Sequence, residues 1–404
     1  MKRSMGCMGL LLALTGPATE AANQEIRALF QPDSSQPGKN VFINQTANSG
    51  YCADYPGECA QNNMFSIQLP VRFDSTRAIM PDESIALKVP ANWRQLTVTN
   101  AETQETETAE VRIIGIGSRF TLSDSAANLV GVTDILEGHQ KLWTSRSWVY
   151  APAPCLYSGV GAYGPASYRF FWKAPVEAEC SKVATHTIPS MYFNTLDFAY
   201  ELRTPNPLGM SSGLYTGALS YRLGPGADFD LGPLMVPDDG NLTLDFVLDV
   251  QHTLKVDLPP GGNKVLLEPE GGWQRWIDSD RKPTRIYRDQ LFYLSASSRF
   301  KVMMLCNSYG GTRCKLGSPK GNTTEVETLL TLPAGITGPG GGPVTLFRLQ
   351  YNTWSGPFQP GIYVDRKAGS LRFEMPQDAI NFLLRPGLSD TLSGSITIIW
   401  DSEV

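Results

Sequence analysis

Apolar and polar residues alternate along most of this chain, and no long stretch follows the helical period. The clearest alternating segments are SIQLPVRF (residues 66–73), AEVRIIGI (109–116) and NLTLDFVLDV (241–250). In the last segment every second residue from Leu242 to Val250 is apolar, so these side chains would line one face of a strand. The pattern predicts strands with one buried face.

Turn residues separate these segments throughout. The chain has 38 glycines and 29 prolines among 404 residues, and clusters such as GITGPGGGP (335–343) stop any regular element. One short helix is predicted at PQDAINFLLRPG (376–387), where Pro386 and Gly387 close it. Further strands are predicted at residues 214–223, 252–258, 264–268, 291–294, 300–307, 324–332, 343–351, 371–374 and 394–401.

Short strands with frequent turns predict an all-β fold made of β-sandwiches. The length suits two or three domains at about 150 residues each. We place a boundary at residues 251–253, between two strands that could run almost continuously from one domain into the next.

The stretch SGLYTGALSYRLGPGADFDLG (212–232) holds five glycines and two aspartates, which raises the possibility of a ligand-binding loop. A dinucleotide loop needs Gly-x-Gly-x-x-Gly followed by a helix. GPGADF lacks the third glycine and no helix follows, so we favour a strand and a turn. Asp228 and Asp230 could form a glycosidase carboxylate pair, but their spacing favours hydrogen bonding within the turn.

Composition gives little support to other chemistry. The net charge of −5 gives a nucleic-acid partner no electrostatic support. There is no Gly-x-Ser-x-Gly, His-Glu-x-x-His or Walker motif, so we predict no catalytic residue and no cofactor. The absence of Cys-x-x-Cys and the wide spacing of the three histidines argue against a metal site. We expect His139 to be a solvated loop residue.

The N-terminus has the layout of a secretory signal peptide, which we assign to residues 1–21. Two basic residues precede an apolar run from Met8 to Leu14 and small residues that end at Ala21. The run is too short to span a bilayer. Cys7 lies in this leader, and an even number of cysteines in an exported chain predicts disulfides. Of the possible pairings, the nearest-neighbour one gives Cys52–Cys59, Cys155–Cys180 and Cys306–Cys314.

The C-terminal stretch LSGSITIIWDSEV (392–404) alternates to its end. Gly394, Ile396, Ile398 and Trp400 would lie on one face of a strand, and Val404 follows. This is either an ordinary last strand of a sandwich or a strand that a periplasmic chaperone binds by adding its own strand.

Four stretches together resemble the tip adhesins of the alternate chaperone–usher (class 5) fimbriae, which include the colonization-factor adhesins and the cable-pilus minor tip pilin. The resemblance covers most of the mature chain in element order. The stretches are YCADYPGECAQNNMFSIQLPVRF (51–73), GLYTGALSYRLGPGADFDLG (213–232), KVMMLCNSYGGTRC (301–314) and GSITIIW (394–400).

The resemblance implies two immunoglobulin-like β-sandwiches and a protein that is not an enzyme. The adhesin domain (22–250) would bind a host-surface glycan or glycoprotein. The pilin domain (253–404) would lack its last strand. A periplasmic fimbrial chaperone and then the major pilin subunit would supply that strand, and an outer-membrane usher would export the assembly to the pilus tip at the cell surface. Residues implied in the strand exchange are Ile396, Ile398, Trp400 and Val404.

A tip subunit needs no donor strand of its own, and we read no long alternation in residues 22–30. In the family, a basic patch binds the receptor. Arg222 matches one of its positions, but VFINQTANSGYC (41–52) has no basic residue at the other. An acidic sugar is therefore not implied. Our candidate receptor-binding residues are Arg222, Arg146, Trp143 and Trp148.

Two other functions fit the same sequence. One is a structural minor pilin that starts assembly without binding a receptor. The other is a secreted β-sandwich enzyme that acts on carbohydrates, which would lose turnover when one carboxylate is changed.

Overall fold

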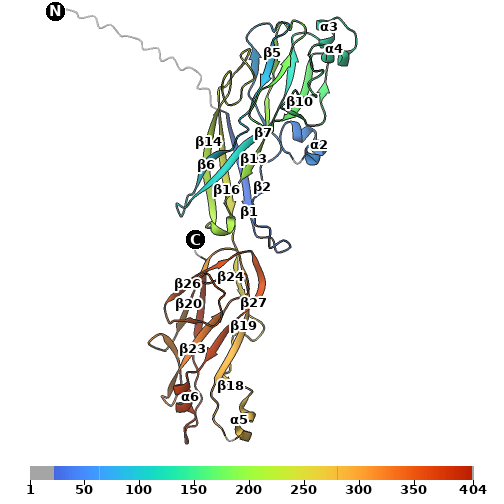
Figure 1. The fold of residues 1–404 in the computed structure, drawn as a ribbon. Helices are drawn as coiled ribbons and strands as arrows, with labels where there is room; N and C mark the ends of the chain where they lie inside the picture. The colour runs from blue at the N-terminus through green and yellow to red at the C-terminus, as the bar shows by residue number, and fades with distance from the viewer. Residues whose placement is uncertain (1–21, 63, 280, 403–404) are drawn as a thin grey trace, which may run out of the picture.

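The structure is a computed structural model that describes residues 22–62, 64–279 and 281–402. The signal-peptide prediction, residues 1–21, therefore lies outside the described residues. The chain is built mainly of strands, which confirms the all-β prediction. Two lobes lie end to end and are joined at residues 251–253 (Figure 1). No described helix is long and apolar enough to cross a membrane.

The first lobe comprises residues 22–250. Its elements are β1 (Ala22–Phe30), β2 (Ile43–Asn44), α1 (Tyr51–Asp54), α2 (Pro56–Gln61), β3 (Ile67–Leu69), β4 (Phe73–Ser75), β5 (Ser84–Leu87), β6 (Arg94–Asn100), β7 (Thr106–Leu122), α3 (Ala126–Val130), α4 (Ile135–Lys141), β8 (Leu156–Tyr157), β9 (Ala162–Tyr163), β10 (Ser167–Lys173), β11 (Cys180–Val183), β12 (Met191–Phe193), β13 (Leu196–Arg203), the 3-10 helix η1 (Pro207–Gly209), β14 (Gly213–Arg222), β15 (Met235–Pro237) and β16 (Asn241–Val250).

The second lobe begins at residue 254. Its elements are β17 (Leu254–Asp257), β18 (Glu268–Pro269), α5 (Trp273–Ser279), β19 (Ile286–Ala296), β20 (Phe300–Cys306), β21 (Tyr309–Gly310), β22 (Arg313–Gly317), β23 (Thr323–Thr331), β24 (Ile336–Thr337), β25 (Phe347–Leu349), β26 (Trp354–Pro360), β27 (Val364–Glu374), α6 (Gln377–Leu383) and β28 (Ile396–Ser402).

Strand β7 organises the first lobe. It is 17 residues long and pairs with β6, β10, β12 and β13. Its inward side chains join one large core that also takes the alternate residues of β16. The alternation in residues 241–250 thus predicted both the bounds and the buried face of β16.

The N-terminal strand differs from our prediction. We expected no long alternation in residues 22–30, yet they form β1, which pairs in parallel with β16 along its whole length. Ile26, Ala28 and Phe30 are buried in the core, while Asn23, Glu25 and Arg27 face outward. Because β16 supplies a complete hydrogen-bonding edge, the whole segment pairs within its own lobe, including the polar residues 23–25.

The second lobe is a sandwich of two sheets around a separate core. One sheet has the order β17-β19-β27-β23-β22-β21, and the other has the order β24-β26-β20-β28. Side chains from both sheets, among them Phe292, Phe300 and Phe358, fill the space between them. The predicted helix at 376–387 is confirmed as α6, shortened to residues 377–383.

Proline and glycine account for the strand predictions that were wrong. Segment 66–73 is interrupted at Pro70, which cannot donate to a ladder, so it yields β3 and β4 instead of one strand. Segment 264–268 contributes only Glu268 to β18. A turn closed by the Gly262 N–H and the Pro259 carbonyl begins a loop that interrupts the pairing with β19 between Asp257 and Glu268.

The three nearest-neighbour disulfides form as predicted. Cys52–Cys59, Cys155–Cys180 and Cys306–Cys314 have Cα–Cα distances of 5.6, 5.8 and 5.8 Å, within the range that a disulfide spans. The first closes the α1–α2 loop, which covers the outer face of the first sheet.

The junction between the lobes is short and hydrogen-bonded on both sides. Half-buried His252 places Nε2 2.9 Å from the Met210 carbonyl and Nδ1 3.0 Å from the Ser297 hydroxyl. Across the same junction the Gln359 side chain donates to the Leu208 carbonyl at 3.3 Å. The linker is therefore held by contacts from both lobes.

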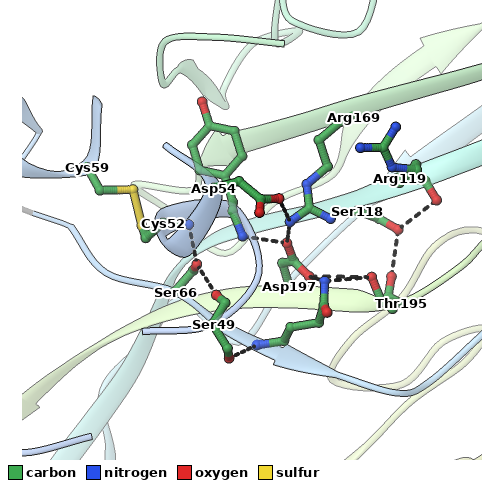
Figure 2. Close-up of polar contacts among 12 residues, drawn as sticks. Ser49, Cys52, Asp54, Cys59, Ser66, Ser118, Arg119, Arg169, Thr195 and Asp197 are labelled. Carbon is green, nitrogen blue, oxygen red and sulfur yellow. Dashed lines mark hydrogen bonds and ion pairs between the residues drawn. A yellow bond between two sulfur atoms is a disulfide. The ribbon is translucent and has the colours of Figure 1, made fainter. Parts of the chain in front are cut away.

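A buried ion pair anchors the α1–α2 loop to the first sheet (Figure 2). Asp197 is fully buried and Arg169 is 4% exposed, and Arg169 Nη2 lies 2.7 Å from Asp197 Oδ2. The same carboxylate accepts hydrogen bonds from the Tyr51 N–H at 3.0 Å and the Gln68 amide at 3.0 Å. Burial raises the pKa of Asp197 even though Arg169 and these hydrogen bonds oppose the shift.

We predict that Asp197→Ala lowers the free energy of unfolding of the first lobe by about 3–5 kcal/mol, because it leaves Arg169 buried without its counter-charge. The matched control is Asp54→Ala. Asp54 also contacts Arg169, at 3.3 Å, but its side chain is 55% exposed, so the cost should stay below about 1 kcal/mol. Urea unfolding measures both, and equal losses would contradict the assignment.

His139 is buried, which corrects our expectation of a solvated residue. It is 0% exposed, because α4 packs it against Phe120 and Tyr168. Nε2 lies 2.8 Å from the Gly164 carbonyl and so carries the proton, while Nδ1 is buried without a partner. Burial lowers the pKa of His139. Protonation at Nδ1 would place an unpaired charge in the core.

This geometry predicts that acid destabilises the first lobe. The pKa of His139 in the folded chain lies below the unfolded value near 6.5, so its contribution is complete above pH 6.5. That contribution is lost as the pH falls toward the folded pKa, by at most about 1.4 kcal/mol per pH unit. Thermal unfolding from pH 7.5 to 5 should show a smaller pH dependence in His139→Gln, which keeps a donor for Gly164. An unchanged pH profile would contradict this role.

Candidate functional site

Strand β28 has one free edge among the described residues. It pairs antiparallel with β20, in register from Cys306–Ile396 to Phe300–Ser402, and it is the last strand of its sheet. The backbone groups on its other edge therefore have no strand partner in the described chain. Such an edge can accept a strand from another chain.

The inward face of β28 is apolar but incompletely covered. Ile396, Ile398 and Trp400 pack against the second core, and each remains partly exposed. The Trp400 ring meets Phe292 at 5.1 Å and Phe300 at 5.8 Å between centroids. The predicted face of this strand is thus the one the structure turns to the core. Val404, the fourth residue of this prediction, lies outside the described residues.

An apolar cleft of about 230 Å³ lies beside the start of β28. It separates residues 263–267, which leave the edge of β19, from the segment 394–396. Six of its nine lining residues have aliphatic or aromatic side chains, and polar atoms form the rest of the wall. The lining residues are Asn263, Val265, Leu267, Leu316, Val326, Phe373, Gly394, Ser395 and Ile396.

The opposite wall of the opening is also an edge. β17 is the end strand of the other sheet, and the residues that follow it expose large apolar side chains. Leu258 is 50% exposed, Val265 37% and Leu266 70%. Val265 lines the cleft, whereas Leu266 lines a separate hollow beside Arg288 and Asp289 of β19. We call the cleft, with the exposed Val265 on one wall and Ile396 on the other, the apolar strip.

Local geometry fixes where β28 begins. The N–H and carbonyl of Ser393 both bond to Gly317, each at 2.9 Å. At Gly394 a Cβ atom would lie 3.0 Å from Leu316 and 3.1 Å from the Lys315 carbonyl. Glycine allows the chain to pass close to β22 before β28 starts.

The glycine-rich stretch 212–232 is a strand and a turn, as predicted. β14 ends at Arg222, and the Asp228 carboxylate accepts the Arg222 N–H at 2.8 Å and pairs with Arg94 at 2.6 Å. Asp230 accepts the N–H groups of Gly226 and Gly232, each at 2.8 Å. The two aspartates therefore hold the turn. Arg222 is exposed beside this turn and lines a shallow hollow.

Trp143 and Trp148 do not reach the surface. They are 2% and 0% exposed, and their rings meet at 5.2 Å within an aromatic cluster that includes Trp172 and Phe120. The large inward faces of β7 and β10 require aromatic side chains to fill the space between them. We therefore withdraw both tryptophans as receptor contacts.

Arg146 is exposed on the same loop. Its φ angle is 62°, and its guanidinium lies 5.7 Å from the Tyr150 ring. The structure thus leaves Arg222 and Arg146 exposed on the first lobe and removes the tryptophans predicted to accompany them.

The described residues contain no group of three or more His, Cys, Asp or Glu side chains that could hold a metal ion.

Of the comparisons with known proteins, only the one with solved structures finds proteins similar to this chain. No protein-family profile and no curated protein matches the chain. Among solved structures it is similar to CfaE, the adhesive subunit of CFA/I fimbria of enterotoxigenic Escherichia coli, with 9% identity, a TM-score of 0.25, and coverage of 95% of this chain and 99% of that chain.

It is also similar to a chain of the CsuC–CsuE chaperone–tip adhesion subunit pre-assembly complex from archaic Csu pili of Acinetobacter baumannii. Identity there is 10%, the TM-score is 0.21, and the match covers 94% of this chain and 98% of that chain. A third similar structure is a chaperone–tip adhesin complex of CFA/I fimbriae, with 10% identity, a TM-score of 0.26 and coverage of 96% and 98%. With TM-scores this low, the function has to be argued from the residues of this chain.

Sequence reasoning missed the second wall of the apolar strip. Val265 and Leu267 belong to a segment predicted as a strand, and nothing in the sequence places it opposite β28. The exposure of Leu258 and Leu266 could not be inferred either, because an apolar residue in a sequence does not reveal whether its partner is present.

We predict that Trp400→Ala lowers the free energy of unfolding of the second lobe by about 2–3 kcal/mol, because it removes a large, partly buried ring from the core. Ile399→Ala on the same strand should cost less than about 1.5 kcal/mol, since Ile399 lies on the other face and is absent from the core cluster. Urea unfolding followed by circular dichroism compares the two. Equal costs would show that β28 does not present its Trp400 face to the core.

Proposed function

We propose that this chain is a tip adhesin of a chaperone–usher fimbria and is not an enzyme. Its second lobe is a pilin domain, residues 253–404, that lacks one strand. A periplasmic chaperone supplies that strand first, and the adjoining major pilin replaces it in the fibre. The observation that carries this proposal is the unpaired edge of β28 beside an open apolar strip.

The groove has the features that a donated strand requires. The edge of β28 offers free backbone groups for a ladder, and the strip beside it offers apolar positions for every second side chain of the donor. Ile396 and Val265 line the cleft from its two walls. A donor of alternating apolar residues would cover both and complete the sandwich.

Among the described residues of the first lobe, we find no free strand that could be donated to a further subunit. The described N-terminal residues, 22–30, are β1, which is fully paired with β16 in its own core. A subunit with an empty groove and no free donor strand fits the end of a fibre. This supports a place at the pilus tip, with export through the periplasm and display at the cell surface.

We assign receptor binding to the first lobe, residues 22–250, and take a host-surface glycan or glycoprotein as the ligand. Arg222 and Arg146 remain the candidate contacts, because both are exposed. Three disulfides hold the loops of the two lobes, as suits a protein that works in an oxidising, mechanically exposed place.

The test is to fuse a donor strand of alternating apolar residues, through a flexible linker, to the C-terminus of residues 22–404. We expect the fusion to be monomeric and to unfold at a temperature at least 10 °C higher in the second lobe than the bare chain, because the donor buries the strip (about 2–3 kcal/mol shifts such a transition by this much).

The matched control is a fusion of the same composition in which the alternation is broken, so that apolar residues no longer face the groove together. Co-expression with a cognate chaperone gives an independent readout of the same groove. A bare chain that is already soluble, monomeric and as stable as the fusion would contradict the proposal.

A further inference from the structure

A second cleft, of about 520 Å³, opens on the flank of the first lobe. It lies over the outer face of β7 and β13, between the start of β6 and the β1–β2 pair. Its size is in the range of ligand-binding clefts. It contains neither Arg222 nor Arg146, the two positions that the sequence had indicated.

At the floor of the cleft, residues of opposite charge face each other across two neighbouring strands, β7 and β13. Arg112 on β7 is opposite Glu201 on β13, and Glu110 is opposite Arg203. The Arg112 and Glu201 groups lie 2.5 Å apart, and the Arg203 and Glu110 groups 3.3 Å apart. The partners are held in fixed positions but remain partly exposed, so their other donors and acceptors stay available.

Trp93 forms a wall beside this floor. The guanidinium of Arg203 lies 3.9 Å from its ring centroid and that of Arg112 lies 4.7 Å away. These contacts fix the orientation of a half-buried indole at the cleft. An indole held in this way offers a flat apolar surface at small cost in side-chain entropy.

The opposite wall combines aromatic rings with an amide. Tyr200 packs edge-on against Phe65 with a centroid distance of 4.5 Å. The Tyr200 hydroxyl lies 3.4 Å from Asn44 Oδ1, and Asn44 is exposed at the cleft. Burial raises the pKa of Tyr200 to about 12, so the hydroxyl stays a donor and holds the amide oxygen.

Three arginines and one carboxylate, Glu201, line the cleft. Each arginine is nevertheless paired, because Glu25 and Glu110, which lie outside the lining, contact Arg27 at 2.5 Å and Arg203 at 3.3 Å. A charged ligand would have to displace one partner of a pair. A neutral ligand with many hydroxyl groups could use the arginines and the Asn44 amide as donors and Glu201 as an acceptor, and it could place its apolar face on Trp93.

We infer that this cleft is a binding site for a neutral saccharide. Sugar rings combine vicinal hydroxyls with an apolar C–H face, and the cleft offers both complements. The inference rests on the proposed receptor-binding role of the first lobe and names the ligand class and the site for it.

Arg222 does not line the cleft, but it lies on the neighbouring strand, β14. Arg94, which follows Trp93, pairs with the Asp228 carboxylate that accepts the Arg222 N–H. The Arg222→Ala variant therefore tests whether the binding site extends from the cleft to the turn after β14.

The experiment probes an array of neutral and sialylated mammalian glycans with residues 22–404, purified as exported. The variants are Trp93→Ala, Asn44→Asp and Arg222→Ala. Asn44→Asp keeps the acceptor for Tyr200 and Thr46 but removes the amide donor. The matched control is Trp354→Ala, which removes a 42% exposed tryptophan from the second lobe that also carries a cation, Lys301, 4.9 Å from its ring centroid.

We expect the parent chain to bind neutral glycans and Trp93→Ala to weaken that binding by about tenfold or more, as loss of a central aromatic contact does. Asn44→Asp should also weaken binding, while Trp354→Ala should leave it unchanged, with unfolding curves confirming that all variants are folded. If the glycans bound by the parent are lost only in Arg222→Ala, the cleft inference is wrong and the receptor-binding role stands. If the parent binds no glycan and no host cell, both fail.

Discussion

The second lobe depends on one constraint, the free edge of β28 beside the apolar side chains of its inward face. Among the described residues, β28 has one free edge and a face that is only partly buried. Water can hydrogen-bond to the free backbone groups, but it does not cover the apolar side chains, so this state costs free energy. In the proposed function, a strand from another chain covers these side chains and so provides the driving force for assembly.

The two lobes divide the work by how completely each closes its core. The first lobe recruits its own N-terminal segment, β1, to finish the sheet beside β16, and it buries an ion pair under the disulfide-closed α1–α2 loop. It is self-sufficient and can present a surface. The second lobe leaves a cleft open between Val265 and Ile396, and His252 at the junction contacts both lobes. In the proposed function, the first lobe is the stable binding lobe and the second is the incomplete anchoring lobe.

The alternation of apolar and polar residues predicted most of the fold from the sequence. It predicted β16 to the residue, the inward face of β28 and the strand nature of β14, because each of these is decided by local polarity and turn residues. It failed where partners far away in sequence decide the outcome. β1 lacks long alternation and is a strand because β16 pairs with it along its whole length. Likewise, Trp143 and Trp148 were candidate receptor contacts, but they lie in the core beside β7 and β10.

The candidate sites show the same limit. The cleft over β7 and β13 depends on the register that sets Arg112 against Glu201, and no spacing in the sequence reveals that pairing. The apolar strip depends on residues 263–267 lying opposite β28, which only the folded lobe shows. The sequence patterns predicted the strands. The two candidate sites, the cleft over β7 and β13 and the apolar strip, depend on how those strands pair in the fold.

The most direct test of the account is hydrogen exchange of the backbone amides of β28 in residues 22–404, measured alone and with an excess of an alternating apolar donor peptide. We predict that the β28 amides that do not bond to β20 exchange rapidly in the chain alone and become protected with the peptide, together with residues 263–267. Amides that are already fully protected in the chain alone, and unchanged by the peptide, would contradict the claim that the lobe is missing a strand.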